Sequence, residues 1–381
     1  MDPLLAWSRR QQPAIVKLIR ELVVCESPSD SPVHVKRLMD VLADAVSDIA
    51  TCKTTPGGAL ACRFRLPGRA KKGQVLALGH ADTVWPLGTL RTMPFRRAQG
   101  RIWGPGVLDM KAGLAFFVFA MRGLGELELA APHDAVLLVN PDEETGSRAS
   151  RAGTEALARR SHAVLVLEPG TGPEGKVKTA RKGIGFYTLR VRGIASHAGV
   201  DFTQGASAVV ELARQIETIA WFTDMKRGIT VNPGVIAGGT RSNVIAAEAT
   251  AEIDIRVPRV ADAKALERKF RALLPFDPRC SLELSGGLNR PPMERSRGVA
   301  ALYRAARRLA RDMGVTLEES ATGGGSDGNF TAALGIPTLD GLGAVGEGAH
   351  AAHESIQEDR IADRVALLAR LVCEPAISYT A

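Results

Sequence analysis

The sequence has few cysteines, few aromatic residues and no long hydrophobic run. Its five cysteines are odd in number, lie far apart and form no CxxC pair. This pattern fits neither a disulfide framework nor a thiolate zinc site, and it favours a reducing compartment. No run approaches the length that spans a membrane, and Arg9, Arg10 and Lys17 interrupt any signal-type segment early. We therefore expect a cytoplasmic protein without a membrane partner.

Aromatic residues are scarce, and the charge is spread out. Three tyrosines and four tryptophans occur in 381 residues, and the net charge of +8 comes mostly from arginines distributed along the chain. A nucleic-acid binder would gather its basic residues and interleave them with aromatic ones. We therefore expect a solvated, arginine-rich surface and no nucleic-acid partner.

The pattern of apolar residues changes near Lys178, in a chain too long for one ordinary core. Earlier apolar runs are typical of strands buried on both faces of a parallel sheet. Gly185–Val191 and Val244–Val257 instead alternate apolar and polar residues, as half-exposed antiparallel strands do, around a predicted helix at Ala206–Ile219. We predict an α/β domain with a mixed, largely parallel sheet flanked by helices over residues 1–180 and 290–381, and an inserted α+β domain over 181–289.

Apolar residues at helical spacing predict the helices of the α/β domain. These are Pro13–Val24, Val33–Ala50, Leu114–Met121, Gly298–Met313 and Arg360–Val372. Between the strand before Asp82 and the third helix, glycines and prolines replace apolar repeats, so a long loop is predicted over Thr83–Gly106. Long loops without secondary structure in compact domains are usually functional.

Three apolar runs are followed at once by acidic or imidazole side chains. They are Val75–Val84, which contains His80 and Asp82, Ala135–Val139, which precedes Glu143 and Glu144, and Ala163–Leu167, which precedes Glu168. Ligands of open α/β sheets bind outside the carboxyl ends of the strands. We expect these side chains to meet at one edge, where they would repel each other unless a cation lay between them. Carboxylate and imidazole ligands suit zinc or a similar divalent metal.

Asp109 directly precedes the third predicted helix. On its own it fits an N-cap as well as it fits a ligand.

Seven motifs, in their order and spacing, resemble those of the M20 family of dinuclear zinc peptidases and deacylases. They are HADTV (His80–Val84), GPGVLDMKAG (Gly104–Gly113), DEETGS (Asp142–Ser147), LEPG (Leu167–Gly170), ASHAG (Ala195–Gly199), TGGGSDG (Thr322–Gly328) and GAHAAHE (Gly348–Glu354). Each motif alone is weak, but together they are specific and cover nearly the whole chain. The segment HADTVWPLGTLRTMPF resembles the glutamate carboxypeptidase branch of that family.

The resemblance implies two zinc ions per subunit, with cobalt or manganese as alternatives. Asp109 would bridge the two ions, His80 and Glu168 would complete one site, and Glu144 and His350 would complete the other. Asp82 would accept the second ring N–H of His80, and Glu143 would be the general base. The resemblance also implies a cis peptide bond after Asp109. His353 is the alternative to His350, but the preceding glycines and the following Glu354 align with His350 as the ligand.

The resemblance assigns further residues to substrate binding and makes the inserted domain a dimerisation or lid domain. His197 would reach the active site of a partner subunit and stabilise the oxyanion, which implies a homodimer. Asn243, Arg256 and Arg290 match positions that line the pocket for the released amino acid, and arginine can grip a carboxylate with two hydrogen bonds. Gly324 would let backbone N–H groups approach the substrate. From the residues alone, His197 and Arg256 also fit ordinary surface positions, and the glycine loop fits a plain turn.

These observations predict a zinc-dependent hydrolase of the carboxypeptidase type. It would cleave an amide or peptide bond and release a C-terminal amino acid with a free carboxylate, with glutamate as the first candidate. The alternative within the family is an N-acyl-amino-acid deacylase, which would use the same metals with a different pocket. Outside this class, a non-catalytic dimeric binding protein would have lost a ligand or the base, and none is lost here.

Overall fold

The computed structural model describes residues 2–69 and 71–374, which form two compact units. Among the described residues, unit 1 comprises 2–69, 71–180, Arg295–Ala321 and 326–374, and unit 2 comprises Arg181–Glu294 and Thr322–Gly325. Unit 1 is therefore assembled from segments on both sides of an insertion.

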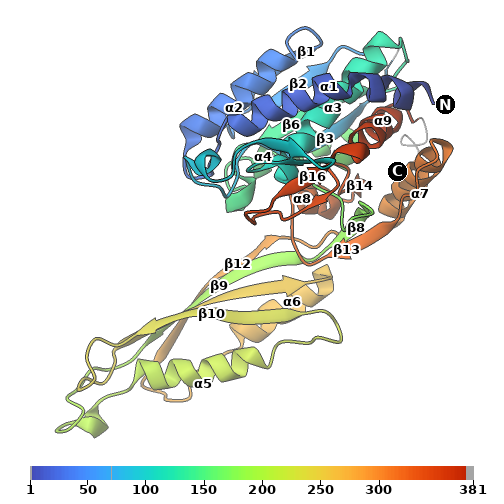
Figure 1. The fold of residues 1–381 in the computed structure, drawn as a ribbon. Helices are drawn as coiled ribbons and strands as arrows, with labels where there is room; N and C mark the ends of the chain where they lie inside the picture. The colour runs from blue at the N-terminus through green and yellow to red at the C-terminus, as the bar shows by residue number, and fades with distance from the viewer. Residues whose placement is uncertain (1, 70, 375–381) are drawn as a thin grey trace. The chain divides into compact units, whose positions relative to one another are not determined.

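A six-stranded mixed sheet forms the centre of unit 1 (Figure 1). In spatial order its strands are β1 (Ala50–Thr54), β2 (Leu60–Phe64), β6 (Asp134–Asn140), β3 (Gln74–His80), β7 (Ser161–Val166) and β14 (Thr338–Leu339). The last four run parallel, whereas β1 and β2 are antiparallel at the edge. The loops after β3, β6 and β7 therefore leave the sheet at the same edge, where α/β proteins bind ligands.

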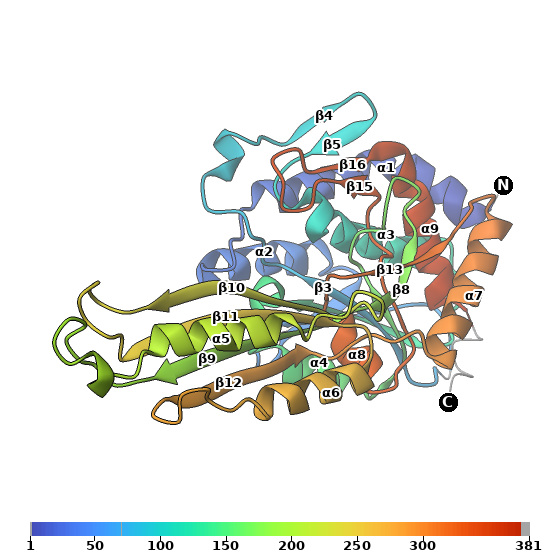
Figure 2. The same ribbon diagram turned by 90° about the horizontal axis from the view of Figure 1, so that it is seen from below.

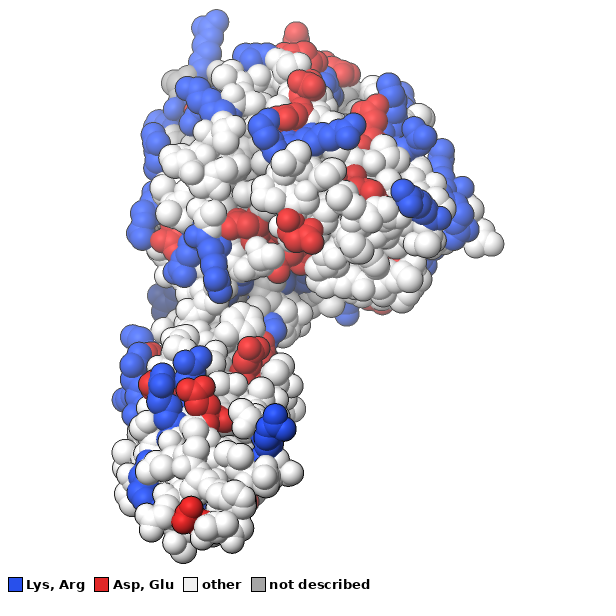
Figure 3. All heavy atoms as spheres, turned by 90° about the vertical axis from the view of Figure 1, so that its left-hand side faces the viewer, with Lys and Arg blue, Asp and Glu red and all other residues white. Residues whose placement is uncertain are grey.

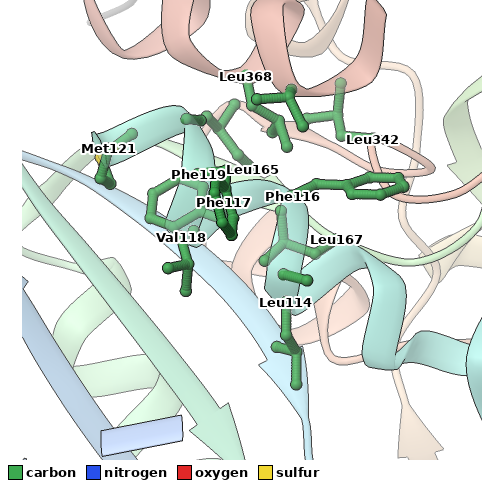
Figure 4. Close-up of a cluster of buried hydrophobic side chains, with 14 of the residues drawn as sticks. Leu114, Phe116, Phe117, Val118, Phe119, Met121, Leu165, Leu167, Leu342 and Leu368 are labelled. Carbon is green, nitrogen blue, oxygen red and sulfur yellow. The ribbon is translucent and has the colours of Figure 1, made fainter. Parts of the chain in front are cut away.

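Helices cover both faces of this sheet, because the strands place apolar side chains on both faces. One face packs against α1 (Pro3–Val24), α3 (Ala112–Glu126), α7 (Arg297–Asp312) and α9 (Ile361–Val372), and the other against α4 (Arg151–Ala158) and α8 (Gly328–Ala333). Figure 4 shows part of the first face, where Phe116 and Phe117 of α3 belong to the same buried cluster as Leu165 of β7 and Leu368 of α9. All seven residues of β3 are buried, which explains its uninterrupted apolar run. The predicted fold class is confirmed.

Three predicted helices differ from the structure by five residues or more at one end. Helix α3 ends at Glu126, five residues after its predicted end. Helix α1 begins at Pro3, ten residues before the predicted start, because the Asp2 carboxylate accepts the N–H of Leu5 at 2.9 Å and caps it. Pro13, a typical first-turn residue, lies inside this helix. Helix α2 spans Pro32–Ala45 and ends five residues before its predicted end.

The predicted loop Thr83–Gly106 is wrong in part, since it contains two short strands. They belong to a second sheet, in the order β15 (Gly346–Glu347), β16 (Ser355–Gln357), β5 (Arg101–Trp103) and β4 (Arg96–Ala98). Within β5 only Ile102 is buried, and its partner strand β16 lies far away in the sequence. A three-residue strand that pairs with so distant a segment leaves no local periodicity to detect.

Unit 2 is a four-stranded antiparallel sheet with α5 (Ala208–Ala220) and α6 (Val260–Arg271) on one face (Figure 2). Its strands, in spatial order, are β10 (Thr230–Gly238), β11 (Glu248–Val257), β9 (Gly183–Arg192) and β12 (Ser281–Arg290). Buried and more exposed residues alternate along β9 and β11, as the polar alternation predicts. Strand β11 starts four residues after its predicted start. The strands β8 (Val177–Arg181) and β13 (Glu319–Thr322) form a separate two-stranded sheet.

The surface carries both signs of charge. On the face shown in Figure 3, lysine and arginine side chains are interspersed with aspartate and glutamate. Among residues 2–69 and 71–374, no helix combines the length and the apolarity needed to cross a membrane.

Candidate metal centre

His80 is the last residue of strand β3, and a backbone carbonyl group binds one nitrogen of its ring. Nδ1 lies 2.9 Å from the carbonyl oxygen of Asp82, and the carboxylate of Asp82 is farther away, at 3.5 Å. A carbonyl oxygen can only accept, so Nδ1 carries the proton and donates it. Nε2 is then the nitrogen that can bind a metal once the ring is neutral.

The carboxylate of Asp82 holds the next loop of the site. It is fully buried and accepts the backbone N–H groups of Glu143 and Glu144, each at 3.1 Å, and the hydroxyl of Ser29 at 2.9 Å. The resemblance gave Asp82 the ring of His80 as its partner. In the structure both the carbonyl and the carboxylate of Asp82 lie near Nδ1 of His80, at 2.9 and 3.5 Å. The same carboxylate also positions the loop after β6.

Asp109 lies in an irregular turn between Gly106 and helix α3, and its carboxylate does not cap that helix. The cap position is Lys111, without a side-chain hydrogen bond. The peptide bond from Asp109 to Met110 is cis, as the resemblance implies. The buried carboxylate of Glu354 accepts the N–H groups of Gly106, Leu108 and Asp109 at 2.8–3.0 Å. Glu354 therefore fixes the turn that presents Asp109.

The two carboxylate oxygens of Asp109 face two different histidines. Oδ1 lies 3.2 Å from Nε2 of His80, and Oδ2 lies 3.4 Å from Nε2 of His350. Glu168 Oε1 lies 3.6 Å from Nε2 of His80, and Glu144 Oε1 lies 3.2 Å from Nε2 of His350. His353, the alternative to His350, is exposed and belongs to neither cluster.

These five residues form two ligand clusters that share Asp109. One is His80, Asp109 and Glu168, the other Asp109, Glu144 and His350, and the ligand atoms of each lie within 4.8 Å of one another. Because Nδ1 of His80 holds the ring proton, Nε2 and the Asp109 oxygen are two acceptors that face each other. Such a contact needs a positive charge between the atoms. Nitrogen and carboxylate oxygen are zinc ligands, so the residues of the two clusters would fit two divalent cations, with Asp109 a member of both clusters.

In the metal-free protein, protons supply that positive charge. The carboxylates of Asp109 and Glu144 raise the pKa of His350 to about 10. Burial alone would lower the pKa of His80, but hydrogen bonds to Asp109, Asp82 and Glu168 raise it well above its usual value. Burial raises the pKa of Glu144. At neutral pH, protons on these side chains therefore supply the positive charge that bound metal ions would supply.

Metal loading is expected to release protons. Below pH 10 the ring of His350 is mostly protonated, and a cation can bind only after displacing that proton, so metal affinity should rise with pH between 6 and 9. Calorimetric titration of the metal-free protein with zinc, in buffers of different ionisation enthalpy, measures the number of protons released. A heat that is independent of the buffer would contradict this arrangement.

Glu143 lies beside the clusters without belonging to either. It is half-buried, and its negative charge contributes to the raised pKa of His80. The loop that carries it is held by Asp142, which accepts from the N–H of Ala149 and the hydroxyl of Ser150, at 2.8 and 2.5 Å. A carboxylate fixed close to the clusters can act as a general base.

Two buried acids of this site were not singled out by the sequence analysis. Glu354 fixes the Asp109 turn, and Asp327 accepts from the hydroxyl of Ser147 at 2.5 Å and the amide of Asn140 at 2.6 Å. Asp327 thereby links the glycine motif to both ends of the Glu143 loop. The sequence did contain one indication of their importance. Each of these acids lies inside one of the seven motifs, although the resemblance assigned no role to either acid.

The predicted substrate residues Arg256 and Arg290 lie together in unit 2. Both stand directly opposite Ile184 of β9, so their side chains share one face at one end of the sheet. The glycine loop approaches them closely, since a Cβ atom added at Gly325 would lie 2.6 Å from Ile184 and 3.0 Å from Arg290. Gly324, the predicted substrate-binding glycine, is the residue before Gly325 in this loop. Each arginine has an internal partner, Asp254 for Arg256 and Asn289 for Arg290.

His197 and Asn243 lie at the opposite end of the same sheet. The residue after His197 donates its N–H to the carbonyl oxygen of Asn243 at 3.0 Å, and both side chains are exposed. Strand β9, with ten residues, begins beside Arg256 and Arg290 and ends shortly before His197. At about 3.3 Å per residue, the two groups are about 30 Å apart. Within one chain, Asn243 therefore does not join Arg256 and Arg290 in one pocket.

Comparisons with known proteins agree with this architecture. Residues 76–374 match the model of peptidase family M20/M25/M40. Carboxypeptidase G2 of Pseudomonas sp. (strain RS-16) is 28% identical over 96% of this chain and 90% of its own length, and a succinyl-diaminopimelate desuccinylase of Azoarcus sp. (strain BH72) is 30% identical over 74% and 78%.

Solved structures share the fold. The aminopeptidase PepT of Bacillus cereus has a TM-score of 0.80 at 23% identity and covers 95% of this chain and 99% of its own. A Bacillus subtilis protein described as a dinuclear metal binding peptidase of family M20 has a TM-score of 0.69 at 14% identity, over 96% and 99%. The match of most of the chain to the family model, together with the two clusters, leads to one conclusion: this chain belongs to peptidase family M20/M25/M40 and is a hydrolase of that family.

Proposed function

We propose that the protein is a zinc-dependent carboxypeptidase that cleaves an amide or peptide bond and releases a C-terminal amino acid with a free carboxylate, glutamate first among them. The main support for a dinuclear centre is the position of Asp109. Its two carboxylate oxygens face histidines of two different clusters. The observation that supports a carboxylate product is the shared face of Arg256 and Arg290. The full-length similarity to carboxypeptidase G2 favours this substrate class.

The residues of unit 1 have separate tasks in this reaction. Cations held by His80 and Glu168, by Glu144 and His350, and by Asp109 between them would lower the pKa of a water and polarise the scissile carbonyl. Glu143 accepts the proton of the attacking water and passes it to the leaving amine. The hydrogen bond from its N–H to Asp82 fixes the backbone of Glu143 beside the clusters.

Arg256 and Arg290 would bind the carboxylate of the released residue. The ion pair with Asp254, at 2.8 Å, orients the guanidinium of Arg256, and the side chain of Arg290 is 4% exposed. A guanidinium fixed in this way can make two hydrogen bonds to a carboxylate with little further loss of entropy. Two arginines on one face also favour a leaving residue with a second negative charge, as in glutamate.

Specificity for glutamate is tested with a panel of N-acyl amino acids that differ in the released residue. We expect kcat/KM for glutamate to exceed that for leucine by about 100-fold or more. Replacement of Arg290 with lysine should raise KM for glutamate, whereas Arg279→Lys, at an exposed ion pair with Asp277, should not. A preference for hydrophobic residues would instead support the N-acyl-amino-acid deacylase. The similarity to a desuccinylase makes an N-succinyl amino acid a necessary member of the panel.

We further propose a homodimer formed through unit 2, with His197 and Asn243 of the partner subunit completing each active site. Strand β10 is an edge of its sheet, and its Val235 and Ile236 are 56% and 64% exposed. Val209 of α5 lines the same apolar groove as Ile236. An exposed apolar edge strand favours pairing with a second chain. The 30 Å between His197 and Arg256 in one chain fits contributions to two different sites.

Mixing two inactive variants tests the partner's contribution. His197→Ala and Glu143→Ala are each expected to be inactive, yet a hybrid dimer has one site with both residues intact. After subunit exchange, about one quarter of wild-type activity should return, because half of the dimers are hybrids with one intact site each. Size-exclusion chromatography establishes the dimer independently. A dimeric mixture that stays inactive after verified exchange would place His197 in its own subunit's site.

A further inference from the structure

Two cysteines that belong to neither metal cluster face each other across a strand pair. Cys52 of β1 and Cys62 of β2 are directly opposite in the antiparallel ladder at the edge of the unit 1 sheet. Cys62 is fully buried, and Cys52 is half-buried. Their Sγ atoms are 2.7 Å apart. No other strand pairing within residues 2–69 and 71–374 sets two cysteines opposite each other.

The hydrogen bonds that flank this pair show which kind of position it occupies. The N–H of Thr55 donates to the carbonyl of Ala59, and the N–H of Arg65 donates to the carbonyl of Ile49, both at 2.8 Å. Bonded and non-bonded pairs alternate along an antiparallel ladder, so the pair at 52 and 62 is a non-bonded one. In such pairs the Cα atoms are about 4.5 Å apart, within the range of about 4.4–6.8 Å found in disulfides.

We propose that Cys52 and Cys62 are a redox modification site that closes to a cross-strand disulfide on reaction with a peroxide. The half-buried thiol of Cys52 is the one that solvent-borne peroxide can reach. Its sulfur attacks the peroxide oxygen and becomes a sulfenic acid, with release of one water. The sulfur of Cys62 then displaces the hydroxyl group, which leaves with the thiol proton as a second water. Two thiols and one hydrogen peroxide thus give one disulfide and two waters.

The surroundings of Cys62 favour this order of events. Burial raises the pKa of its thiol well above the usual value, so Cys62 is protonated at physiological pH and is a poor first target for oxidants. It becomes reactive only toward a sulfenic acid held beside it. The remaining cysteines have no such neighbour in a ladder, which makes Cys25, Cys280 and Cys373 internal controls.

The disulfide would link the edge strand β1 covalently to β2, which pairs with a strand that leads into the site. Strand β2 pairs with β6, whose last residue Asn140 leads into the Glu143 loop. A cross-link in a short hairpin constrains the unfolded chain. Oxidised protein should therefore melt at a higher temperature than reduced protein. In a reducing compartment such a disulfide would be transient, as in redox sensors.

The experiment is mass spectrometry of the intact full-length protein before and after hydrogen peroxide. We expect the loss of two hydrogen atoms, a cross-linked peptide that contains Cys52 and Cys62 in a non-reducing digest, and full reversal by dithiothreitol. Cys52→Ser and Cys62→Ser should each abolish the cross-link, whereas Cys280→Ser should retain it. Oxidation of Cys52 to a sulfinic acid with Cys62 left free, or a cross-link to any other cysteine, would overturn the proposal. Because the readout is mass, its result is independent of the proposed substrate.

Discussion

Replacement of Glu143 with glutamine is expected to lower kcat about 10²- to 10⁴-fold, the range for loss of a general base. Glutamine preserves the shape of the side chain but cannot accept the proton of the attacking water. Since Glu143 belongs to neither ligand cluster, metal content should stay at the wild-type level. Steady-state kinetics and metal analysis of the same preparation measure both quantities.

The matched control is Glu217→Gln, which makes the same change on an exposed position of α5. It should leave kcat and metal content unchanged. If Glu143→Gln lost metal as well as activity, the side chain would be a ligand and the separation of base from ligands would be wrong.

Replacement of Asp109 with alanine is expected to remove both the metal and the activity. Its two oxygens face His80 and His350, so the substitution takes a ligand from both clusters at once. Loss of metal catalysis removes several kcal/mol of transition-state stabilisation, which corresponds to about 10³-fold or more in kcat/KM. Metal analysis after dialysis should find less than one equivalent per subunit.

Asp359→Ala, at an exposed residue before α9, is the control for removing an acid elsewhere in unit 1. Circular dichroism shows whether Asp109→Ala retains the fold. A folded Asp109→Ala protein that still bound two metals would show that Asp109 does not bridge them, and it would separate the metal proposal from the family assignment.

The parts of the fold that could be predicted are those whose signal is local. Strands β3, β6 and β7 are buried on both faces, so their sequences are apolar runs that end at His80, Asn140 and Val166. The acids that follow these runs come together because parallel strands end at one edge. Helix α9 was predicted within one residue at each end for the same reason, since its apolar face is continuous.

What could not be predicted depends on contacts between distant segments. The hairpin of β4 and β5 is stabilised through β16, which follows it only after the whole inserted segment. Glu354 and Asp327 are acids without a distinctive spacing, and their tasks become visible only when the N–H groups and hydroxyls they accept are located in space. Cys52 and Cys62 look like scattered residues until the register of β1 and β2 pairs them.

The roles of Asp109 and Asp82 show the limit of reading residues one at a time. Position alone allowed Asp109 to be a helix cap, and only the facing histidines remove that interpretation. Asp82 was expected to orient His80 through its carboxylate. The carboxylate does lie 3.5 Å from the ring, but the backbone carbonyl is nearer, and the carboxylate also holds the Glu143 loop.

The hydrogen bonds of Glu354 have a consequence for protein synthesis. His80, Asp109, Glu144 and Glu168 leave the ribosome before the inserted segment Arg181–Glu294, whereas His350 and the carboxylate that fixes the Asp109 turn emerge after it. A nascent chain with unit 2 already complete would therefore still lack His350, a member of the second cluster, and the carboxylate that fixes the Asp109 turn shared by both clusters. Both clusters can be completed only after the C-terminal segment of unit 1 has been synthesised.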